Sequence, residues 1–271
     1  MKLKHLIVTG LVGVALVGCQ QKKGGDAAPP EAAKAAAAEA GKDEAAEPAK
    51  DEAPAAAAAG TNTLKGSVAW DGDAPKRKKL NREADPVCDK EEMLAEETIV
   101  TEGKLANVVV TIAGQGFAAK AASGDIAIAQ QSCMYRPRIQ CGVVGQKVAI
   151  TNADATMHNI HGYKEGGAKS WFNQAQMGGA PPVKKELKKA GVAAFKCDVH
   201  PWMAGYVYTT ETGYCAVSAE DGSWALEGLP AGKWTITAWH EIYGEKTAEV
   251  TIEEGKEASL DITYSANDKQ S

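Results

Sequence analysis

The residues best suited to chemistry lie in two short segments of the chain. Cys197, His200 and Met203 form a Cys-x-x-His-x-x-Met run, and His158 and His161 lie upstream in a Met-His-Asn-Ile-His run. Two imidazoles and a thiolate in one plane, with a distant methionine sulfur on the axis, make the type 1 copper site that carries single electrons. The sequence therefore predicts one mononuclear copper site, with His158, Cys197, His200 and Met203 as its ligands.

Two other chemistries use the same residue types. Zinc is usually held by Cys and His in a closed tetrahedral shell and would gain little from Met203. Cys197 and His200 could also be a thiol nucleophile with its base, but such enzymes place the histidine elsewhere in the sequence and need an oxyanion site. The sequence contains no candidate motif for an oxyanion site, so we expect an electron-transfer protein rather than an enzyme.

Short strands must position these ligands. Apolar and β-branched segments bounded by Gly, Pro, Asp and Asn predict strands at residues 64–70, 107–113, 125–129, 147–152, 192–197, 205–210, 216–218, 224–226, 233–240, 246–252 and 258–264. Regular short strands with turn signals favour an all-β fold built from β-sandwiches, where loops after distant strands can meet. One short helix is expected at residues 89–97, where acidic residues suit the first turn.

The ligand segments resemble those of the cupredoxin family, in particular its amicyanin-like members. Residues 197–203 reproduce the spacing Cys-x-x-His-Pro-aromatic-Met, and residues 157–161 match a Pro-His-Asn-Val-His run except that Met157 replaces the proline. The resemblance implies a cupredoxin-like Greek-key sandwich over about residues 125–208. It also implies that His158 rather than His161 is the ligand, and that Asn159 ties the two ligand loops together.

The route of the electron can be predicted from the same loop. We expect it to leave through His200, inside an apolar patch made by Pro201, Trp202 and Ala204, with Met157 and Met177 as further candidates. Small interfaces of this kind suit brief redox encounters.

A second resemblance begins at about residue 216. Asp-Gly-Ser-Trp at 221–224, Leu-Pro-Ala-Gly at 229–232 and the aromatic strand after them resemble the carboxypeptidase regulatory-like, transthyretin-like sandwich, up to Tyr264. The glycines of Asp221-Gly222 and Ala231-Gly232 suit hairpin turns that need positive φ.

We expect a copper domain at residues 61–215, whose first strands (61–124) look like additions in larger relatives. A small sandwich at 216–264 and a tail at 265–271 follow. Residues 64–70 also resemble the opening strand of the second family, so the two β-units could share sheets.

Two of the six cysteines have predicted roles outside disulfides, Cys197 as a metal ligand and Cys19 as the lipidation site discussed below. With Cys19 and Cys197 set aside, Cys88, Cys133, Cys141 and Cys215 remain, an even set that predicts two disulfides in an oxidising compartment, with three possible connectivities. Alternatively some of them join the metal site, although none has metal-ligand spacing to another cysteine. Resemblance to larger relatives, which carry the first two together, favours Cys88–Cys133 and Cys141–Cys215.

The N-terminal segment predicts export. Lys2 and Lys4 precede an apolar run at residues 6–17 that is too short to span a bilayer, so residues 1–18 are expected to be a signal peptide. The ending Leu-Val-Gly-Cys resembles the lipobox of bacterial lipoproteins, which implies an acylated Cys19 and a membrane anchor. The alternative is an ordinary signal peptide with a stray cysteine. Because no aspartate follows Cys19, the resemblance favours the outer membrane, facing the periplasm or the cell surface.

Composition limits the remaining possibilities. Residues 19–60 lack aromatic and β-branched side chains and predict a disordered Ala/Lys/Glu/Pro tether. A net charge of −5 and the absence of a basic stripe argue against a nucleic-acid partner. Three functions stay open: electron shuttling with a redox partner protein, copper carriage or sensing without redox turnover, and adhesion by a sandwich that binds no metal.

Overall fold

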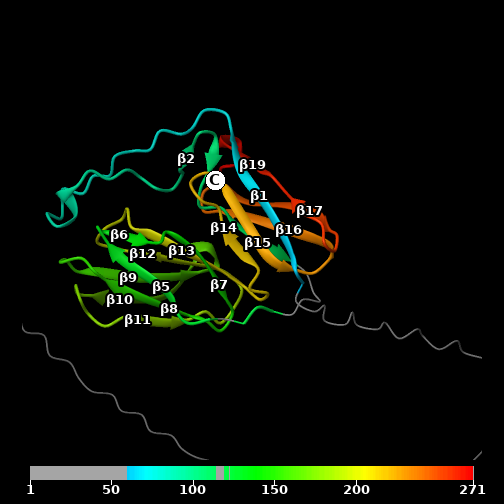
Figure 1. Cartoon of the computed structure of the whole chain (residues 1–271). Coiled ribbons are helices and arrows are strands. Elements are labelled where there is room, and N and C mark those ends of the chain that lie inside the picture. Colours follow the sequence, from blue (N-terminus) through cyan, green and yellow to red (C-terminus); the bar gives the residue numbers. More distant parts are fainter. Residues whose placement is uncertain (1–59, 114–118, 122, 271) are drawn as a thin grey trace, which may run out of the picture. The chain divides into compact units, whose positions relative to one another are not determined.

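The computed structural model describes residues 60–113, 119–121 and 123–270, which fold almost entirely as strands (Figure 1). Helical structure among these residues is limited to three-residue 3₁₀ turns, and no helix there is long and apolar enough to cross a membrane. The prediction of an all-β protein is confirmed. The expected signal peptide, Cys19, residues 20–59 of the expected tether and Ser271 lie outside the described residues.

The first sandwich comprises the strands between residues 126 and 210. One sheet has the order β10-β9-β12-β13-β7 and the facing sheet the order β11-β8-β5-β6. The strands are β5 (Ile126–Gln131), β6 (Met134–Arg136), β7 (Ile139–Val143), β8 (Lys147–Asn152), β9 (His158–Lys164), β10 (Lys169–Gln176), β11 (Val183–Glu186), β12 (Gly191–Lys196) and β13 (Ala204–Thr210). Side chains that alternate along these strands, such as Ile128, Ile150, Ile160, Phe195 and Val207, fill one core between the sheets.

The second sandwich is built from both ends of the described chain. Its strands are β1 (Asn62–Asp71), β2 (Val100–Thr101), β3 (Lys104–Leu105), β4 (Val109–Ala113), β14 (Cys215–Val217), β15 (Ser223–Leu229), β16 (Gly232–His240), β17 (Gly244–Ile252), β18 (Ala258–Ser259) and β19 (Ile262–Ser265). β1 pairs with β15, β18 and β19, and β4 lies between β14 and β16. Leu64, Leu105, Leu226, Ile236 and Tyr264 share its core.

This pairing differs from the linear domain order expected from the sequence. Residues 62–71 and 109–113, expected in the copper domain, hydrogen-bond to C-terminal strands instead. The first sandwich is thus inserted between two parts of the second. Residues 64–70 share a sheet with C-terminal strands, which their resemblance to an opening strand had suggested. At the expected hairpin glycines, Gly222 has φ +75° and Gly232 has φ +146°, backbone conformations that other residues rarely adopt.

Several side-chain contacts connect the sandwiches, among them a disulfide and a buried ion pair. A disulfide between Cys141 of β7 and Cys215 of β14 crosses from one to the other. Beside it in the chain, Arg138 forms a two-pronged ion pair with Glu241, at 2.6 and 2.7 Å, and both side chains are at most 5% exposed.

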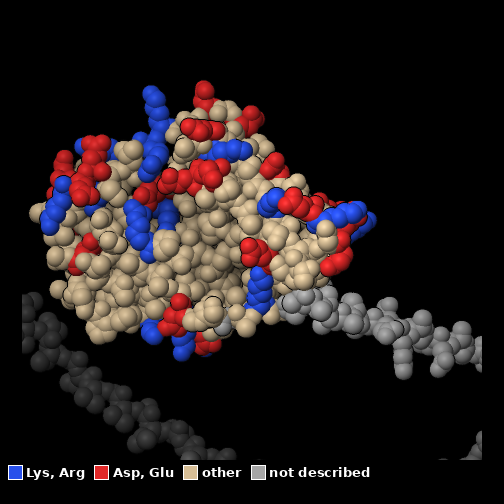
Figure 2. All heavy atoms as spheres, in the orientation of Figure 1, with Lys and Arg blue, Asp and Glu red and all other residues tan. Residues whose placement is uncertain are grey.

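Residues 72–99, which we call the strap, run from β1 to β2 by way of the first sandwich (Figure 1). Figure 2 shows that its end of the molecule carries basic and acidic side chains intermixed. The helix expected at residues 89–97 is wrong: only the 3₁₀ turn η1 (Cys88–Lys90) forms. Residues 93 and 95 instead hydrogen-bond to Leu80 and Lys78 in an extended bridge, and the disulfide Cys88–Cys133 fixes the turn against the sandwich.

Candidate metal centre

Three neighbouring strands bring the predicted ligands to one end of the five-stranded sheet. β12 runs antiparallel to both β9 and β13, so its C-terminal end meets the N-terminal ends of the other two. His158 is the first residue of β9, Cys197 directly follows β12, and Met203 directly precedes β13. His200 lies in the short loop between Cys197 and Met203. Regular strand pairing therefore positions residues that are far apart in the sequence.

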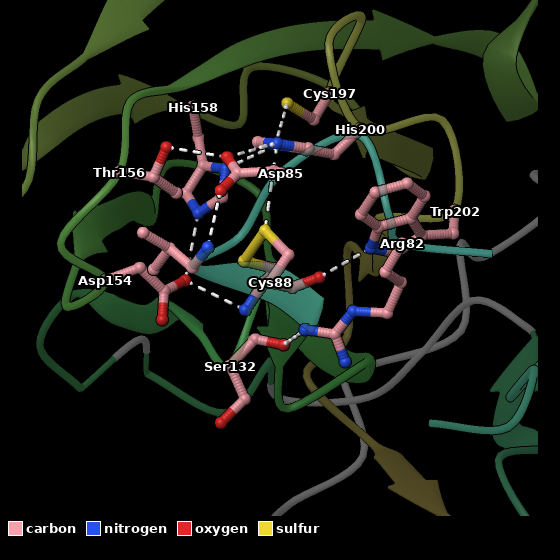
Figure 3. Close-up of a disulfide and its surroundings, with 12 residues drawn as sticks. Arg82, Asp85, Cys88, Ser132, Asp154, Thr156, His158, Cys197, His200 and Trp202 are labelled. Atoms are coloured by element: carbon pink, nitrogen blue, oxygen red, sulfur yellow. Dashed lines mark hydrogen bonds and ion pairs between the residues drawn. A yellow bond between two sulfur atoms is a disulfide. The ribbon is translucent and has the colours of Figure 1, made fainter. Parts of the chain in front are cut away.

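The ligand atoms of three predicted residues face one another (Figure 3). Nδ1 of His158 lies 2.8 Å from Nδ1 of His200, and the sulfur of Cys197 lies 3.7 Å from the same nitrogen of His200. All three ligand atoms lie within 4.8 Å of one another, and the side chains are at most 4% exposed. Met203 is fully buried in the same core, and its backbone N–H donates to the carbonyl of His200.

Two carboxylates determine which ring nitrogens are free. Nε2 of His158 is 2.9 Å from Oδ2 of Asp154, and Nε2 of His200 is 3.0 Å from Oδ2 of Asp85. An ionised carboxylate only accepts hydrogen bonds, so each Nε2 carries the hydrogen and each Nδ1 presents a lone pair. Two lone pairs facing each other at 2.8 Å repel unless a proton or a metal cation lies between them.

The donor set fits copper. Two imidazole nitrogens, a buried thiol and a buried thioether are the ligands of a type 1 site, and imidazoles oriented by carboxylates at their far nitrogens are typical of metal centres. Cys133 and Cys88 also lie in clusters with Asp154 and Asp85, but their sulfurs are joined in a disulfide and cannot act as thiolate ligands.

Burial favours the uncharged forms of the Cys197 thiol and the His158 imidazole. It raises the pKa of the Cys197 thiol, although the backbone N–H groups of Asn159, Val199 and His200 act in the opposite direction. It also lowers the pKa of His158. Burial tends to raise the pKa of Asp85, but hydrogen bonds from Thr156, Val87 and His200 bring it below its usual range. A metal ion would therefore displace the thiol proton on binding, beside a carboxylate that is already charged.

Asn159 connects the two ligand segments. Its side-chain oxygen accepts from the backbone N–H of Asp198, next to Cys197, at 2.6 Å, and its amide donates to the Asp198 carboxylate at 2.9 Å. His161 belongs to the same surface network: its Nδ1 lies 3.0 Å from Asp198, its Nε2 lies 3.0 Å from Ser170, and its ring stacks on Tyr163. The structure thus separates His161 from the ligand cluster.

The surroundings of His200 differ from the sequence-based expectation. His200 was expected to be the exit for the electron inside an apolar patch, yet it is 4% exposed, because Asp85 and Cys88 of the strap cover its Nε2 edge. The half-buried Trp202 lies beside it, with ring centroids 5.2 Å apart. Met177, one of the side chains expected in the patch, is exposed, and Val199 is a further large apolar side chain exposed in the ligand loop.

Both disulfides favoured from the resemblance are present. Cys88 pairs with Cys133 and Cys141 pairs with Cys215, and Cys197 is the free cysteine among the described residues. Sequence reasoning missed Asp85 and Asp154. Asp154 could have been found as the carboxylate four residues before His158, but nothing near Asp85 in the sequence connects it to a histidine more than a hundred positions away.

Comparison with known proteins gives matches among solved structures alone: no known protein family and no curated protein matches the chain. The purple cupredoxin from Nitrosopumilus maritimus is 26% identical, covering 32% of this chain and 100% of that chain, with a TM-score of 0.28. Amicyanin from Paracoccus versutus is 18% identical, covering 37% and 97%, with a TM-score of 0.28. A Cu-containing nitrite reductase from Thermus scotoductus SA-01 is 17% identical, covering 37% and 25%, with a TM-score of 0.30. These similarities span about a third of the chain, so a functional assignment rests on its own residues.

Proposed function

We propose that this protein binds one copper ion through His158, Cys197, His200 and Met203 and transfers single electrons. The observation that carries the proposal is the pair of Nδ1 atoms facing each other at 2.8 Å beside a buried thiol, with each Nε2 held by a carboxylate. Two imidazole lone pairs this close in a buried core repel each other unless a proton or a cation lies between them. A bound cation removes their repulsion.

Different parts of the chain would have different roles at such a site. Copper would supply the one-electron change, cycling between its two oxidation states. The strands behind the ligands fix their positions, so little rearrangement is needed between the two states. Burial of all four side chains excludes water, and Asn159 holds the loop of Cys197 against the strand of His158.

The proposal extends to location and partner. The signal peptide and the lipobox-like Cys19 support export and anchoring to a bacterial membrane, with residues 20–59 as the tether. The partner would be a redox protein that docks briefly at the ligand end of the first sandwich. Met177 and Val199, 64% and 49% exposed, are the apolar side chains available there.

An absorption spectrum of the copper-loaded protein tests the metal and redox parts of the proposal. A Cu(II) ion bound by the Cys197 thiolate gives an intense visible charge-transfer band, which reduction bleaches and reoxidation restores. Cys197→Ser should abolish the band. A colourless wild-type protein holding one copper ion would contradict electron transfer and support a copper carrier, and a protein that binds no copper would leave the adhesion alternative.

Release from membranes tests the anchor. Wild-type protein should fractionate with membranes and enter detergent, whereas Cys19→Ser should be found in the soluble exported fraction. Equal fractionation of the two would contradict lipidation at Cys19.

A further inference from the structure

The strap reaches the metal centre with one charged group. Asp85 lies near the middle of the strap, and its carboxylate contacts both the strap and the first sandwich. One oxygen accepts from the backbone N–H of Val87 at 2.8 Å, while the other accepts from Thr156 Oγ1 at 2.8 Å and from His200 Nε2 at 3.0 Å. With its side chain 17% exposed, the carboxylate is largely shielded from water. Its position is therefore fixed from two sides.

The two histidines receive their carboxylates from different parts of the fold. Asp154 belongs to the turn between β8 and β9, four residues before His158, and also accepts from the backbone N–H of Cys133. It is part of the sandwich. Asp85 comes from a segment without regular strands, which the disulfide Cys88–Cys133 and a hydrogen bond from Arg82 to the carbonyl of Ser132 join to the first sandwich. The carboxylate on His200 is thus supplied by the strap and not by the sandwich that carries the histidine.

We propose that Asp85 is a positioning residue of the metal centre, through which the closed strap orients His200 and stabilises the oxidised copper ion. This inference rests on the proposed function. A carboxylate that accepts from the far nitrogen of a ligating imidazole makes the imidazole a stronger donor and adds negative charge near the metal. Both effects favour Cu(II) over Cu(I), so the contact of Asp85 with His200 lowers the reduction potential.

The variant Asp85→Asn separates charge from shape. Asparagine has nearly the same size and keeps an oxygen that can accept from Nε2 of His200, but it removes the negative charge. We expect the ratio of the Cu(II) to the Cu(I) binding constant to fall about tenfold, which corresponds to a rise in potential of about 59 mV for one electron. Spectroelectrochemical titration of the full chain measures this shift.

Asp89→Asn is the matched control. Asp89 is exposed on the turn η1 of the same strap and has no hydrogen bond to a ligand among the described contacts. Its substitution removes the same charge at a solvated position, so the change in reduction potential should be only a small fraction of the change seen for Asp85→Asn. Equal shifts in the two variants, or no shift in either, would overturn the role of Asp85.

A second measurement uses protein without metal. Asp85→Ala removes both the charge and the hydrogen bonds that hold the strap over His200, so alkylation of the buried Cys197 thiol should become at least tenfold faster than in the wild type. Asp89→Ala should leave the rate unchanged. An unchanged rate in Asp85→Ala would show that Asp85 does not hold the strap closed, and would overturn the inference whether or not the protein proves to be a copper protein.

The two measurements distinguish the possible failures. If the wild type shows no charge-transfer band with copper, the proposed function fails, while the alkylation rates still decide whether Asp85 closes the strap. If the band is present and Asp85→Asn leaves the potential unchanged, the proposed function stands and the inference fails.

Discussion

The side chains around the metal centre owe their roles to their hydrogen-bond partners rather than to residue type. His158 and His161 are three residues apart on β9 and therefore point to opposite faces of the strand. Asp154 is hydrogen-bonded to Nε2 of His158, which leaves Nδ1 directed at His200. In contrast, Asp198 is hydrogen-bonded to Nδ1 of His161 at the surface. Of the two, only His158 presents an unprotonated nitrogen to Cys197 and His200.

Substitution of the two histidines is the first prediction. His158→Ala should lose the copper centre and its visible band, because it removes one of three close ligands. His161→Ala should keep the band, because the contacts that it breaks, with Asp198, Ser170, Tyr163 and Asn173, include no predicted ligand. Copper content and absorption of the two variants measure the difference. Loss of copper in His161→Ala with retention in His158→Ala would reverse the assignment.

The clustering of the candidate ligands could be predicted from the sequence because their signal is local. Cys197, His200 and Met203 share one seven-residue loop, and the upstream His-Asn pair has its own pattern. The carboxylate of Asp85 lacks any such signal, since its contact with His200 spans 115 positions. Burial of His200 could not be predicted for the same reason: the covering segment is an irregular strap from another part of the chain.

At the scale of elements, strand positions are more predictable than strand partners. Each segment predicted as a strand overlaps one in the structure, because β-branched and apolar alternation is a property of the segment itself. Other strands have no counterpart among the expected segments: β2, β3, β6, β7, β9, β10 and β11. In β10 the side chains are mostly polar and exposed, so the apolar alternation is missing. The pairing of β1 with β15 and β19 joins the two ends of the described chain, which no local pattern specifies.

The two disulfides lead to a prediction at this scale. Replacing both cysteines of either disulfide by alanine should lower the free energy of unfolding by about 2–4 kcal/mol. Each disulfide closes a long loop, because Cys88 and Cys133 are 45 positions apart and Cys141 and Cys215 are 74 positions apart. Denaturant unfolding measures this loss. The pair Cys88→Ala and Cys133→Ala should also speed alkylation of Cys197 in metal-free protein, since that disulfide holds the strap.

The pair Cys141→Ala and Cys215→Ala is the control for the metal centre. That disulfide joins the two sandwiches away from the ligand loop and should leave the reactivity of Cys197 unchanged. Equal acceleration in both double variants would mean that general destabilisation, rather than the strap, exposes the thiol.

At the scale of the whole molecule, the ion pair Arg138–Glu241 links the two sandwiches in a nearly dry environment. Glu241→Gln should lower the free energy of unfolding by about 3–5 kcal/mol, because it leaves the buried guanidinium of Arg138 without its counter-charge. Glu257→Gln, which removes an exposed pair with Lys65, should have no measurable effect. Equal stability of wild type and Glu241→Gln in denaturant titrations would contradict a structural role for the pair.

The stability of the second sandwich should depend on the charge of His240. Burial, with a smaller contribution from Arg138, lowers the pKa of His240 from 6.5 to about 3, and its Nδ1 accepts from the backbone N–H of Ile242. The unfolded chain therefore binds this proton more readily than the folded one, so stability present above about pH 6.5 is lost as the pH falls toward 3. The slope of the loss is at most about 1.4 kcal/mol per pH unit.

His240→Asn isolates this contribution, because asparagine keeps an acceptor near the position of Nδ1 but does not titrate in this range. The free energy of unfolding, measured with denaturant between pH 7 and pH 4, should fall more steeply for the wild type than for the variant. Carboxylates elsewhere titrate in both proteins, so their effect cancels in the difference. Parallel curves would show that the ring is as easily protonated in the folded protein as in the unfolded chain, and that its burial against Tyr243 and Tyr264 does not oppose the charge.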